Sequence, residues 1–342
     1  MTEERTVRFA AVGLNHGHIY GQTNALLGAG AELVYYFAKE PELAAQYHAA
    51  YPQAKLGTSV QAILEDESID LIITAGIPSE RAELGIAAMR HGKDFMSDKP
   101  GFTSLAQLEE ARRVQAETGR IYSIDFSERF ENRATTKAAE MVRGGAIGQV
   151  VNTIGTGPHL ARLATRPPWF FERARYGGII TDIASHQFDQ FLYVTGAKQV
   201  EIVAAQVANY KHPEHPELED FGHVMLSAEH CTGYIRVDWF TPDGLPTWGD
   251  GRLFVVGTEG TIEVRKYLDI AGRPGADHLF LVDHKDVQYI DCSGVELSYG
   301  RQLVYDILHR TETAMTQGHC FYASELALRA QEMATRLGYL AK

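Results

Sequence analysis

The sequence has few cysteines, no excess of basic residues and no long apolar run. Cys231, Cys292 and Cys320 stand far apart among 342 residues without Cys-x-x-Cys spacing, which fits a reducing cytoplasm better than a secreted disulfide framework. The net charge of -12 argues against a nucleic-acid partner, because phosphate binding requires a basic surface. No window holds the roughly 18 consecutive apolar residues of a membrane helix, and residues 1–5 show no apolar signal core. We therefore expect a cytoplasmic protein without a membrane partner.

The length and hydrophobic content suffice for two domains, because 45% of the 342 residues are hydrophobic and single domains run to about 100–200 residues. In the first third, strand and helix patterns alternate, which is typical of a parallel sheet with right-handed crossovers. The strand signals lie at 6–12, 32–37, 70–75, 93–97 and 121–125. The helix signals lie at 17–28, 41–50, 59–65, 79–91 and 104–118, with Ser59, Ser79 and Ser104 at their starts and Gly92 and Gly119 as stops.

After residue 148 the pattern changes to longer strands separated by turns. These signals lie at 149–157, 200–210, 221–228, 231–241, 252–256 and 260–265. Strands joined by turns, without helices between them, predict one mixed and largely antiparallel sheet.

The segment Gly177–Asp189 places Asp182, His186 and Asp189 at i, i+4 and i+7, which on a helix puts all three on one face. Apolar residues interleave with them: Ile179, Ile180, Ile183, Ala184, Phe188, Phe191 and Leu192. Such a helix is mostly buried, and polar groups in apolar surroundings are hydrogen-bonded or functional. A carboxylate one turn from an imidazole can tune its basicity, so His186 is a candidate acid/base group. The alternative is a structural His–Asp pair.

A second candidate segment, Phe95–Pro100, ends an αβ unit that begins at Leu71–Ala75. Pro100 stops the strand, and Lys99 before it stands at the carboxyl edge of a parallel sheet, where open α/β folds bind ligands. The Lys99–Pro100 bond is also a candidate for cis geometry. Alone, an Asp-Lys-Pro tripeptide is common on protein surfaces.

The third candidate segment is a strand that runs straight into a turn with Gly13, Gly17 and Gly21, followed by a helix. Glycines in such a turn let backbone N–H groups approach a pyrophosphate at the helix N-terminus. Asn15 replaces the second glycine of the usual Gly-x-Gly-x-x-Gly spacing. Asparagine tolerates left-handed backbone angles, so we expect the turn to form.

Two motifs contain residue types that bind metals. His16 and His18 form a His-x-His pair, but with no nearby cysteine or carboxylate in the sequence we expect no metal there. The segment His212–Glu217 contains His and Glu residues, but its prolines and its polarity favour a solvated loop.

The three candidate segments, in this order, resemble the Gfo/Idh/MocA family of oxidoreductases, and the resemblance covers nearly the whole chain. Asp98-Lys99-Pro100 stands where the family has Glu-Lys-Pro. The family motif Gly-Gly-x-x-x-Asp-x-Gly-x-His-x-x-Asp is matched by Gly177, Gly178, Asp182, His186 and Asp189, with Ala184 where the family often has glycine. The segments 257–263 and 327–332 look like the family's sheet hairpin and terminal helix.

The resemblance implies an α/β protein with an N-terminal Rossmann domain and a C-terminal α+β domain built on a large, mostly antiparallel open sheet. We place these domains at 1–126 and 127–342, with the terminal helix as a candidate to pack back on the first. The implied activity is hydride transfer between a nicotinamide and a hydroxyl or carbonyl of a sugar, cyclitol or similar polyol. Lys99 and His186 would be catalytic, and Asp182 would assist them and bind substrate.

The end of the second strand bears on which nicotinamide cofactor is used, because an acidic residue there accepts hydrogen bonds from the ribose. The expected acid aligns with Ala38, and Lys39 follows it, a pair that suits a 2'-phosphate. We therefore favour NADP, while Glu40 leaves NAD open. The cofactor-binding candidates are Gly13, Leu14, Asn15, His16, Gly17, His18, Ala38, Lys39, Gly76, Pro78, Arg81, Lys99 and Pro100.

The substrate-binding candidates are His159, Arg162, Trp169, Asp182 and His186. Aromatic and cationic groups before the Gly177 helix line the pocket in relatives, and here they suit a polyhydroxylated ring; their alternative role is packing at the domain junction. Arg129, in a segment that resembles one near the nicotinamide, is equally a candidate salt-bridge partner. Family members often pair through the open sheet, so we expect a homodimer or homotetramer.

Two other functions remain open on this scaffold, because fold does not fix function. The altered glycine turn and Asp98 keep a non-catalytic dinucleotide-binding regulator in play. A family-like glycosidase that retains its cofactor is the third possibility, and would show hydrolysis without net redox change.

Overall fold

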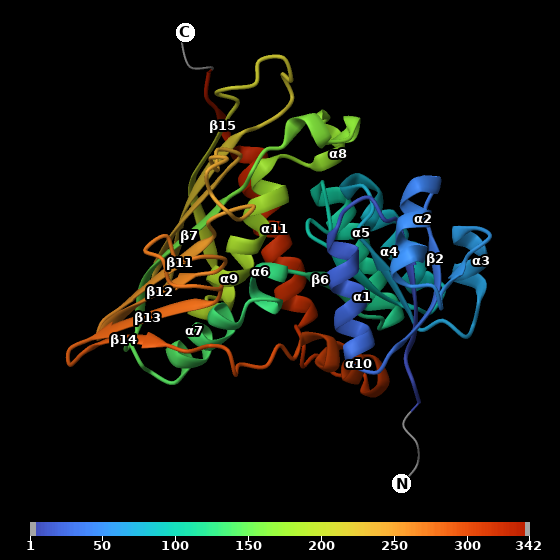
Figure 1. The fold of residues 1–342 in the computed structure, drawn as a ribbon, viewed down its shortest axis with the longest axis horizontal. Coiled ribbons are helices and arrows are strands. Elements are labelled where there is room, and N and C mark those ends of the chain that lie inside the picture. Colours follow the sequence, from blue (N-terminus) through green and yellow to red (C-terminus); the bar gives the residue numbers. More distant parts are fainter. Residues whose placement is uncertain (1–4, 339–342) are drawn as a thin grey trace. The chain divides into compact units, whose positions relative to one another are not determined.

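The computed structural model describes residues 5–338, and the chain divides into two compact units (Figure 1). The first unit runs to Asp125 and also contains Ser298–Tyr322. The second unit contains Phe126–Leu297 and continues from Ala323. We predict one division of the chain, after residue 126. The structure also groups the later segment Ser298–Tyr322 with the first unit.

The first unit is built on a six-stranded parallel sheet in the order β3-β2-β1-β4-β5-β6. Its strands are β1 (Arg8–Val12), β2 (Glu32–Phe37), β3 (Lys55–Leu56), β4 (Leu71–Thr74), β5 (Asp94–Asp98) and β6 (Tyr122–Asp125). Its helices are α1 (His18–Gly28), α2 (Pro41–Ala50), α3 (Val60–Glu65), α4 (Pro78–Arg90), α5 (Leu105–Thr118) and α10 (Tyr299–His309). This strand order is that of the Rossmann fold, as predicted.

Helix ends in the first unit follow the expected capping chemistry. The Ser59 side chain accepts a hydrogen bond from the Ala62 amide (3.0 Å), and Gly119 closes α5 with a left-handed φ of 63°. Ser79 does not start α4, contrary to expectation, because Pro78 occupies the first turn, where its missing N–H costs nothing.

The second unit contains a nine-stranded mixed sheet in the order β14-β13-β12-β11-β7-β10-β9-β8-β15. The predicted strands are β7 (Val150–Pro158), β8 (Val200–Ala208), β9 (Phe221–Ala228), β10 (Thr232–Asp238), β11 (Arg252–Gly257) and β12 (Gly260–Arg265). Three strands were not predicted from the sequence: β13 (His278–Asp283), β14 (Val287–Ile290) and β15 (Thr335–Arg336). Only β7 with β10 and β8 with β15 pair in parallel among the described strands of this sheet, so it is mostly antiparallel, as predicted.

Helices cover one face of this sheet (Figure 1). They include α6 (Ser127–Phe130), α7 (Arg133–Arg143), α8 (Arg173–Tyr176), α9 (Ser185–Thr195) and the later part of α11 (Gln317–Met333). Inward-facing strand residues such as Val255 and Ile262 form a core with Ala138 of α7, and all three are at most 1% exposed. The opposite face carries the alternate residues of each strand.

The segment before α9 departs from the single α-helix that we predict. Ile180–Ala184 form a π-helical turn, so Asp182, His186 and Asp189 do not follow one regular α-helical face. Asp182 is half-buried, whereas His186 and Asp189 are 2% and 0% exposed. The amides of Ile180 and Thr181 donate to the side-chain oxygen of Gln331 at 2.9 and 3.3 Å, which caps this irregular start.

Among residues 5–338, no helix has the length and apolar composition required to span a lipid bilayer.

Candidate active site

The turn after β1 has the backbone geometry that the glycine pattern predicts. Gly13 has a φ of 78°, and its amide donates to the Phe37 carbonyl at 2.9 Å. A Cβ atom at Gly13 would lie 3.0 Å from the Gly76 Cα and 3.1 Å from the Thr74 Oγ1. Only glycine therefore fits this turn, which suits a dinucleotide whose diphosphate needs close backbone approach.

Asn15 and Lys39, two of the predicted cofactor-binding residues, each contact a carboxylate. The Asn15 Nδ2 donates to Glu40 Oε1 at 2.9 Å, so Glu40, the alternative ribose acceptor, is engaged by the glycine turn. Lys39 Nζ lies 3.1 Å from Glu80 Oε2, with side chains 74% and 45% exposed. Exposed pairs of this kind contribute little, so Lys39 remains available to a charged ligand.

Arg81 holds the end of β5 and the turn after β4 in place. Its Nε donates to the Gly76 carbonyl at 2.7 Å, and its Nη1 donates to the carbonyls of Lys99 and Pro100 at 2.6 and 3.1 Å. Its Nη2 donates to Asp98 Oδ2 at 3.1 Å. The Lys99–Pro100 bond is cis, as anticipated. The guanidinium thus positions the Asp-Lys-Pro segment, and a direct role for Arg81, or for Pro78 at the start of α4, in binding cofactor stays a prediction.

Both histidines of the glycine turn lie beside Asp98. The Asp98 oxygens are 3.4 Å from His16 Nδ1 and 2.8 Å from His18 Nδ1. Burial opposes ionisation of Asp98, but His18 and Arg81 hold its pKa well below the usual range. Burial and His18 lower the pKa of His16, although a third of its side chain is exposed. Our expectation that no carboxylate stands near the His-x-His pair is therefore wrong, because β5 ends beside this turn in space.

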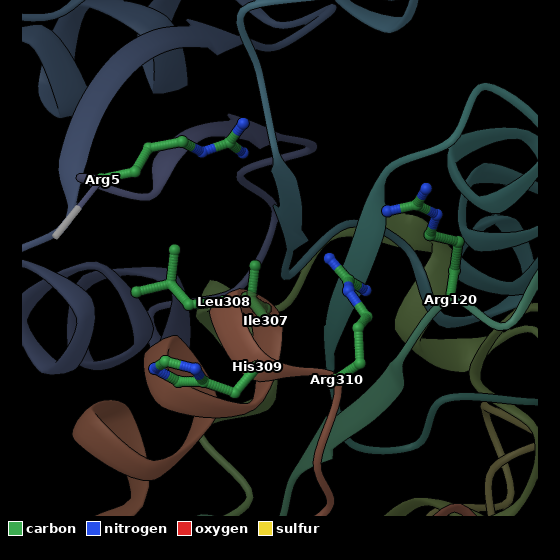
Figure 2. A pocket seen from close by; sticks show the side chains of 6 residues that line it. All are labelled: Arg5, Arg120, Ile307, Leu308, His309 and Arg310. Atoms are coloured by element: carbon green, nitrogen blue, oxygen red, sulfur yellow. The ribbon is translucent and has the colours of Figure 1, made fainter.

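A pocket of the first unit, shown in Figure 2, lies at the amino-terminal ends of its parallel strands. It is lined by Arg5, Arg120, Ile307, Leu308, His309 and Arg310, and the first two stand just before β1 and β6. Arg5 pairs with Asp70, and Arg310 binds both oxygens of Asp94 at 2.7 and 2.8 Å. These pairs neutralise two of the three arginines. Gly13 and Lys99 lie elsewhere, after the carboxyl-terminal ends of β1 and β5.

In the second unit, His159 follows β7 within a group of aromatic rings. Its ring centroid lies 5.4 Å from that of Trp239 and 4.5 Å from that of Trp248. Trp248 in turn lies 4.4 Å from Tyr267. The His159 Nδ1 is 3.0 Å from the Gly157 carbonyl and is assigned as the donor, because a carbonyl oxygen can only accept.

Arg166 packs against the same aromatic group. Its guanidinium carbon lies 4.5 Å from the Phe170 ring and 5.1 Å from the Trp239 ring, and its Nε donates to the Ala161 carbonyl at 2.9 Å. Burial lowers its pKa, and the charge of Asp182 partly offsets this effect.

The predicted residues Arg162 and Trp169 have no such central place. Arg162 is exposed, with a left-handed φ of 47°, and half-buried Trp169 meets Phe170 edge to face at 6.3 Å. Arg166, which we did not select, is therefore the better substrate-binding candidate of this segment, because it joins the aromatic group around His159.

His186 lies on buried α9, with its ring edge to face with Phe126 at 6.4 Å. Glu128 is near it and accepts hydrogen bonds from Lys266 and from Gln187 Nε2 (2.9 Å). Burial alone would raise the pKa of Glu128, but Lys266 and the imidazoles of His186 and His159 lower it to about 2. His186 therefore shares a buried site with an ionised carboxylate, which stabilises positive charge on the imidazole.

Asp189, the third polar residue of the motif, is bound by Arg129. The Arg129 Nε and Nη2 donate to its two oxygens at 2.7 and 2.6 Å, and both side chains are buried. Arg129 is thus a salt-bridge partner, which is one of the two roles that the sequence allows for it.

Lys266 is the buried residue of this site that sequence reasoning missed. The sequence does contain a signal for Lys266. The strand alternation that buries Ile262 and Val264, continued one residue beyond β12, also buries Lys266. A lysine at such a position requires a buried partner. That partner, Glu128, is 138 residues away in sequence, so the pair itself could not be found without the fold.

The chain matches two family models, which cover successive parts of it. "Oxidoreductase family, NAD-binding Rossmann fold" matches residues 7–126, and "GFO/IDH/MocA C-terminal domain" matches residues 135–263. The chain therefore belongs to the GFO/IDH/MocA family of oxidoreductases, as the motifs predict, and its first unit has the NAD-binding Rossmann fold.

Individual relatives agree with this assignment. The scyllo-inositol 2-dehydrogenase (NAD(+)) of Bacillus subtilis strain 168 is 28% identical over 266 residues, which are 76% of this chain and 74% of that protein. The scyllo-inositol 2-dehydrogenase (NADP(+)) of the same organism is 24% identical over 176 residues, about half of each chain (52% and 48%). A crystal structure from Erwinia carotovora atroseptica SCRI1043, described as an oxidoreductase, is 44% identical with a TM-score of 0.95 over 97% of this chain and 100% of that chain.

Proposed function

We propose that this protein is a nicotinamide-dependent dehydrogenase of polyhydroxylated rings, such as cyclitols and sugars, with His186 as the acid/base group. The proposal rests on the buried His186, which lies near the ionised carboxylate of Glu128. The imidazole of His159, which belongs to the aromatic group, acts on the same carboxylate. The inositol dehydrogenases among the relatives support the same substrate class.

The dinucleotide would be held by the Gly13 turn and by the segment that Arg81 positions, and when bound it supplies or accepts the hydride. His186 takes the proton from a substrate hydroxyl during oxidation and returns it during reduction. Glu128 remains an anion while this happens, because Lys266 is bonded to it, so the imidazolium gains a fixed counter-charge. Lys99 donates a hydrogen bond to the substrate oxygen and stabilises developing alkoxide charge.

The substrate ring is proposed to rest on the aromatic group of the second unit. The C–H face of a cyclitol or sugar is apolar and packs on indole rings, here those of Trp239 and Trp248. The second ring nitrogen of His159, Nε2, and the carboxylate of Asp182 then bind ring hydroxyls.

A substrate screen tests this proposal. The purified protein is incubated with NAD or NADP and a panel of inositols, aldoses and anhydrosugars, and formation of reduced nicotinamide is followed by absorbance. We expect turnover with a member of this panel and none with simple alcohols that lack the ring. Normal cofactor binding without turnover of any member would favour the regulatory alternative, and hydrolysis without net reduction would favour the glycosidase.

We further propose a preference for NADPH, supported by the neutral Ala38 and the accessible Lys39 at the end of β2. In a fluorescence titration, Lys39→Ala should weaken NADPH binding by up to about tenfold and leave NADH binding unchanged, because a phosphate contact by an exposed lysine contributes about 1.5 kcal/mol. Lys55→Ala, an exposed lysine on β3, serves as the matched control. Equal affinities for both cofactors, unaltered by Lys39→Ala, would contradict the preference.

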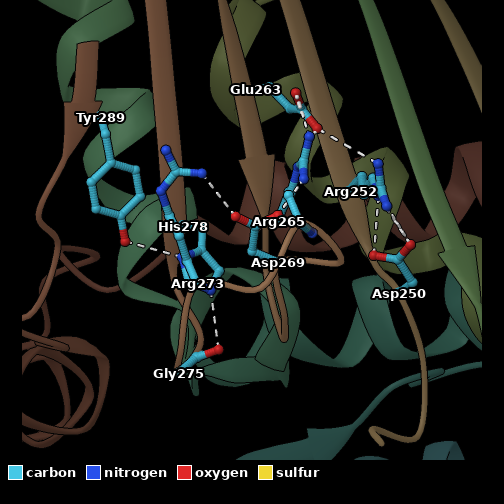
Figure 3. A network of polar contacts seen from close by, with 10 residues as sticks. Asp250, Arg252, Glu263, Arg265, Asp269, Arg273, Gly275, His278 and Tyr289 are labelled. Carbon is cyan, nitrogen blue, oxygen red and sulfur yellow. Dashed lines mark hydrogen bonds and ion pairs between the residues drawn. The ribbon is translucent and has the colours of Figure 1, made fainter. Parts of the chain in front are cut away.

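We also infer that copies of the chain associate through the outer face of the nine-stranded sheet, as a dimer or tetramer. Ile154, Met225 and Val282 are 36%, 49% and 41% exposed on that face. Beside them runs a belt of paired charges (Figure 3), in which Arg252 and Arg265 both contact Glu263. Sedimentation should detect an oligomer that Met225→Glu dissociates, and a monomer at every protein concentration would contradict this inference.

A further inference from the structure

We propose that His16, His18 and Asp98 form a binding site for a divalent transition-metal ion, with Zn²⁺ as the best match. One nitrogen or oxygen from each residue lies within 4.8 Å of the others. Two imidazoles and one carboxylate are a donor set that zinc accepts, with a fourth position left for water. Among residues 5–338 this is the one group of three such ligands that the fold assembles.

The donor atoms lie close enough to converge on one ion. Ligand atoms about 2.0–2.1 Å from zinc lie roughly 3.3 Å apart at tetrahedral angles. His18 Nδ1 lies 2.8 Å from Asp98 Oδ1, and His16 Nδ1 lies 3.4 Å from the other carboxylate oxygen, Oδ2. Because the donor atoms are up to 4.8 Å apart, the side chains must move closer together to coordinate one ion.

The hydrogen bonds around His16 and His18 show which contacts an ion would replace. The His18 amide lies 3.3 Å from His16 Nδ1, and the Nδ1 atoms of His16 and His18 lie 3.4 and 2.8 Å from the Asp98 oxygens. An imidazole nitrogen has one lone pair, so a nitrogen that binds the ion cannot also accept the amide N–H. Zinc binding through His16 Nδ1 would therefore replace the bond from the His18 amide, whereas binding through Nε2 would leave it in place.

The surroundings of Asp98 match those of a metal-bound carboxylate. Arg81 donates to Oδ2 at 3.1 Å, which fixes the carboxylate and leaves Oδ1 directed at His18. The Asp98 side chain is 1% exposed, whereas His16 and His18 are 33% and 32% exposed, so an ion can enter from solvent. The positive charge of Arg81 opposes a divalent ion, and we therefore expect weaker binding than at a structural zinc site.

The metal and the dinucleotide should exclude each other, a consequence that rests on the proposed function. His16 and His18 belong to the turn whose Gly13 backbone is proposed to approach the diphosphate. An ion held by these imidazoles fixes the turn around itself. Because coupling between two ligands is reciprocal, zinc should weaken NADPH binding by the factor by which NADPH weakens zinc binding.

The test is calorimetric titration of ZnCl₂ into tag-free protein. We expect one ion per chain, and binding at least about tenfold weaker in His16→Gln and in His18→Gln, as loss of a ligand requires. His212→Gln is the matched control, because His212 also lies 3.3 Å from a carboxylate, Glu214, but has no second imidazole in a metal-ligand group. Zinc should also raise the melting temperature of the wild type and of the control, but not of the two other variants.

Two outcomes separate this proposal from the proposed function. Undiminished binding of one zinc ion by folded His16→Gln and His18→Gln would overturn the metal site. Zinc binding that is lost in His18→Gln but unaffected by saturating NADPH would establish the metal site and instead show that the dinucleotide does not use the Gly13 turn.

Discussion

His186→Ala is expected to lower kcat on the true substrate by about 100-fold or more, because a positioned acid/base group typically contributes a factor of this size. Lys99→Ala should lower kcat to a similar extent. The dissociation constant for NADPH should change little in His186→Ala, since His186 lies on α9 of the second unit and the Gly13 turn belongs to the first. Steady-state kinetics and a cofactor titration on the same preparation measure both quantities.

The control for this experiment is His230→Ala. His230 is 85% exposed on the turn between β9 and β10, so its loss should leave kcat unchanged. Asp182→Asn should reduce turnover as well, because it removes a proposed acceptor for substrate hydroxyls. Turnover near the wild-type rate in His186→Ala would show that His186 does not transfer the proton. Glu128 would then have no role as its counter-charge.

Gly13→Val should abolish dinucleotide binding. A β-branched residue is strongly disfavoured at a φ of 78°, and its Cβ would meet the Gly76 backbone at 3.0 Å. The larger side chain also fills the space in which the diphosphate must approach the backbone. Fluorescence titration with NADPH measures the loss, and circular dichroism checks that the variant folds.

Gly28→Ala is the matched control for Gly13→Val. Gly28 ends α1, and a Cβ there meets no atom within 4 Å among the described residues, so binding should be retained. Should folded Gly13→Val bind NADPH like the wild type, the cofactor site would have to be placed elsewhere in the chain.

Local signals account for most of the fold that could be predicted from sequence. The alternation of buried strands and capped helices in the first unit is encoded by residues close in the chain, such as Ser59 with Ala62. β15 could not be found this way, because its two residues become a strand only by pairing with β8, more than a hundred residues earlier. β13 lies in a region rich in charges and glycines, and it gains its strand identity from the Ile262–Leu281 pairing with β12.

The candidate site shows the same division between local and distant information. The order of Lys99, Asp182 and His186 was readable because each stands in a short motif. The buried contacts around the site could not be predicted, since Asp98 meets His18 across 80 residues and Lys266 meets Glu128 across 138. The error about the His-x-His pair has the same cause, because Asp98 is near these histidines in space and not in sequence.

The cap on the π-helical turn determines when this segment can become ordered during protein synthesis. The amide of Ile180 is bonded to Gln331, 151 residues later, and a Cβ on Gly178 would lie 2.3 Å from the same side-chain oxygen. During synthesis from the N-terminus, the segment that carries His186 therefore leaves the ribosome long before its cap exists. A nascent chain can complete its first βα repeats early, but it gains the ordered start of this helix only after Gln331 has been synthesised.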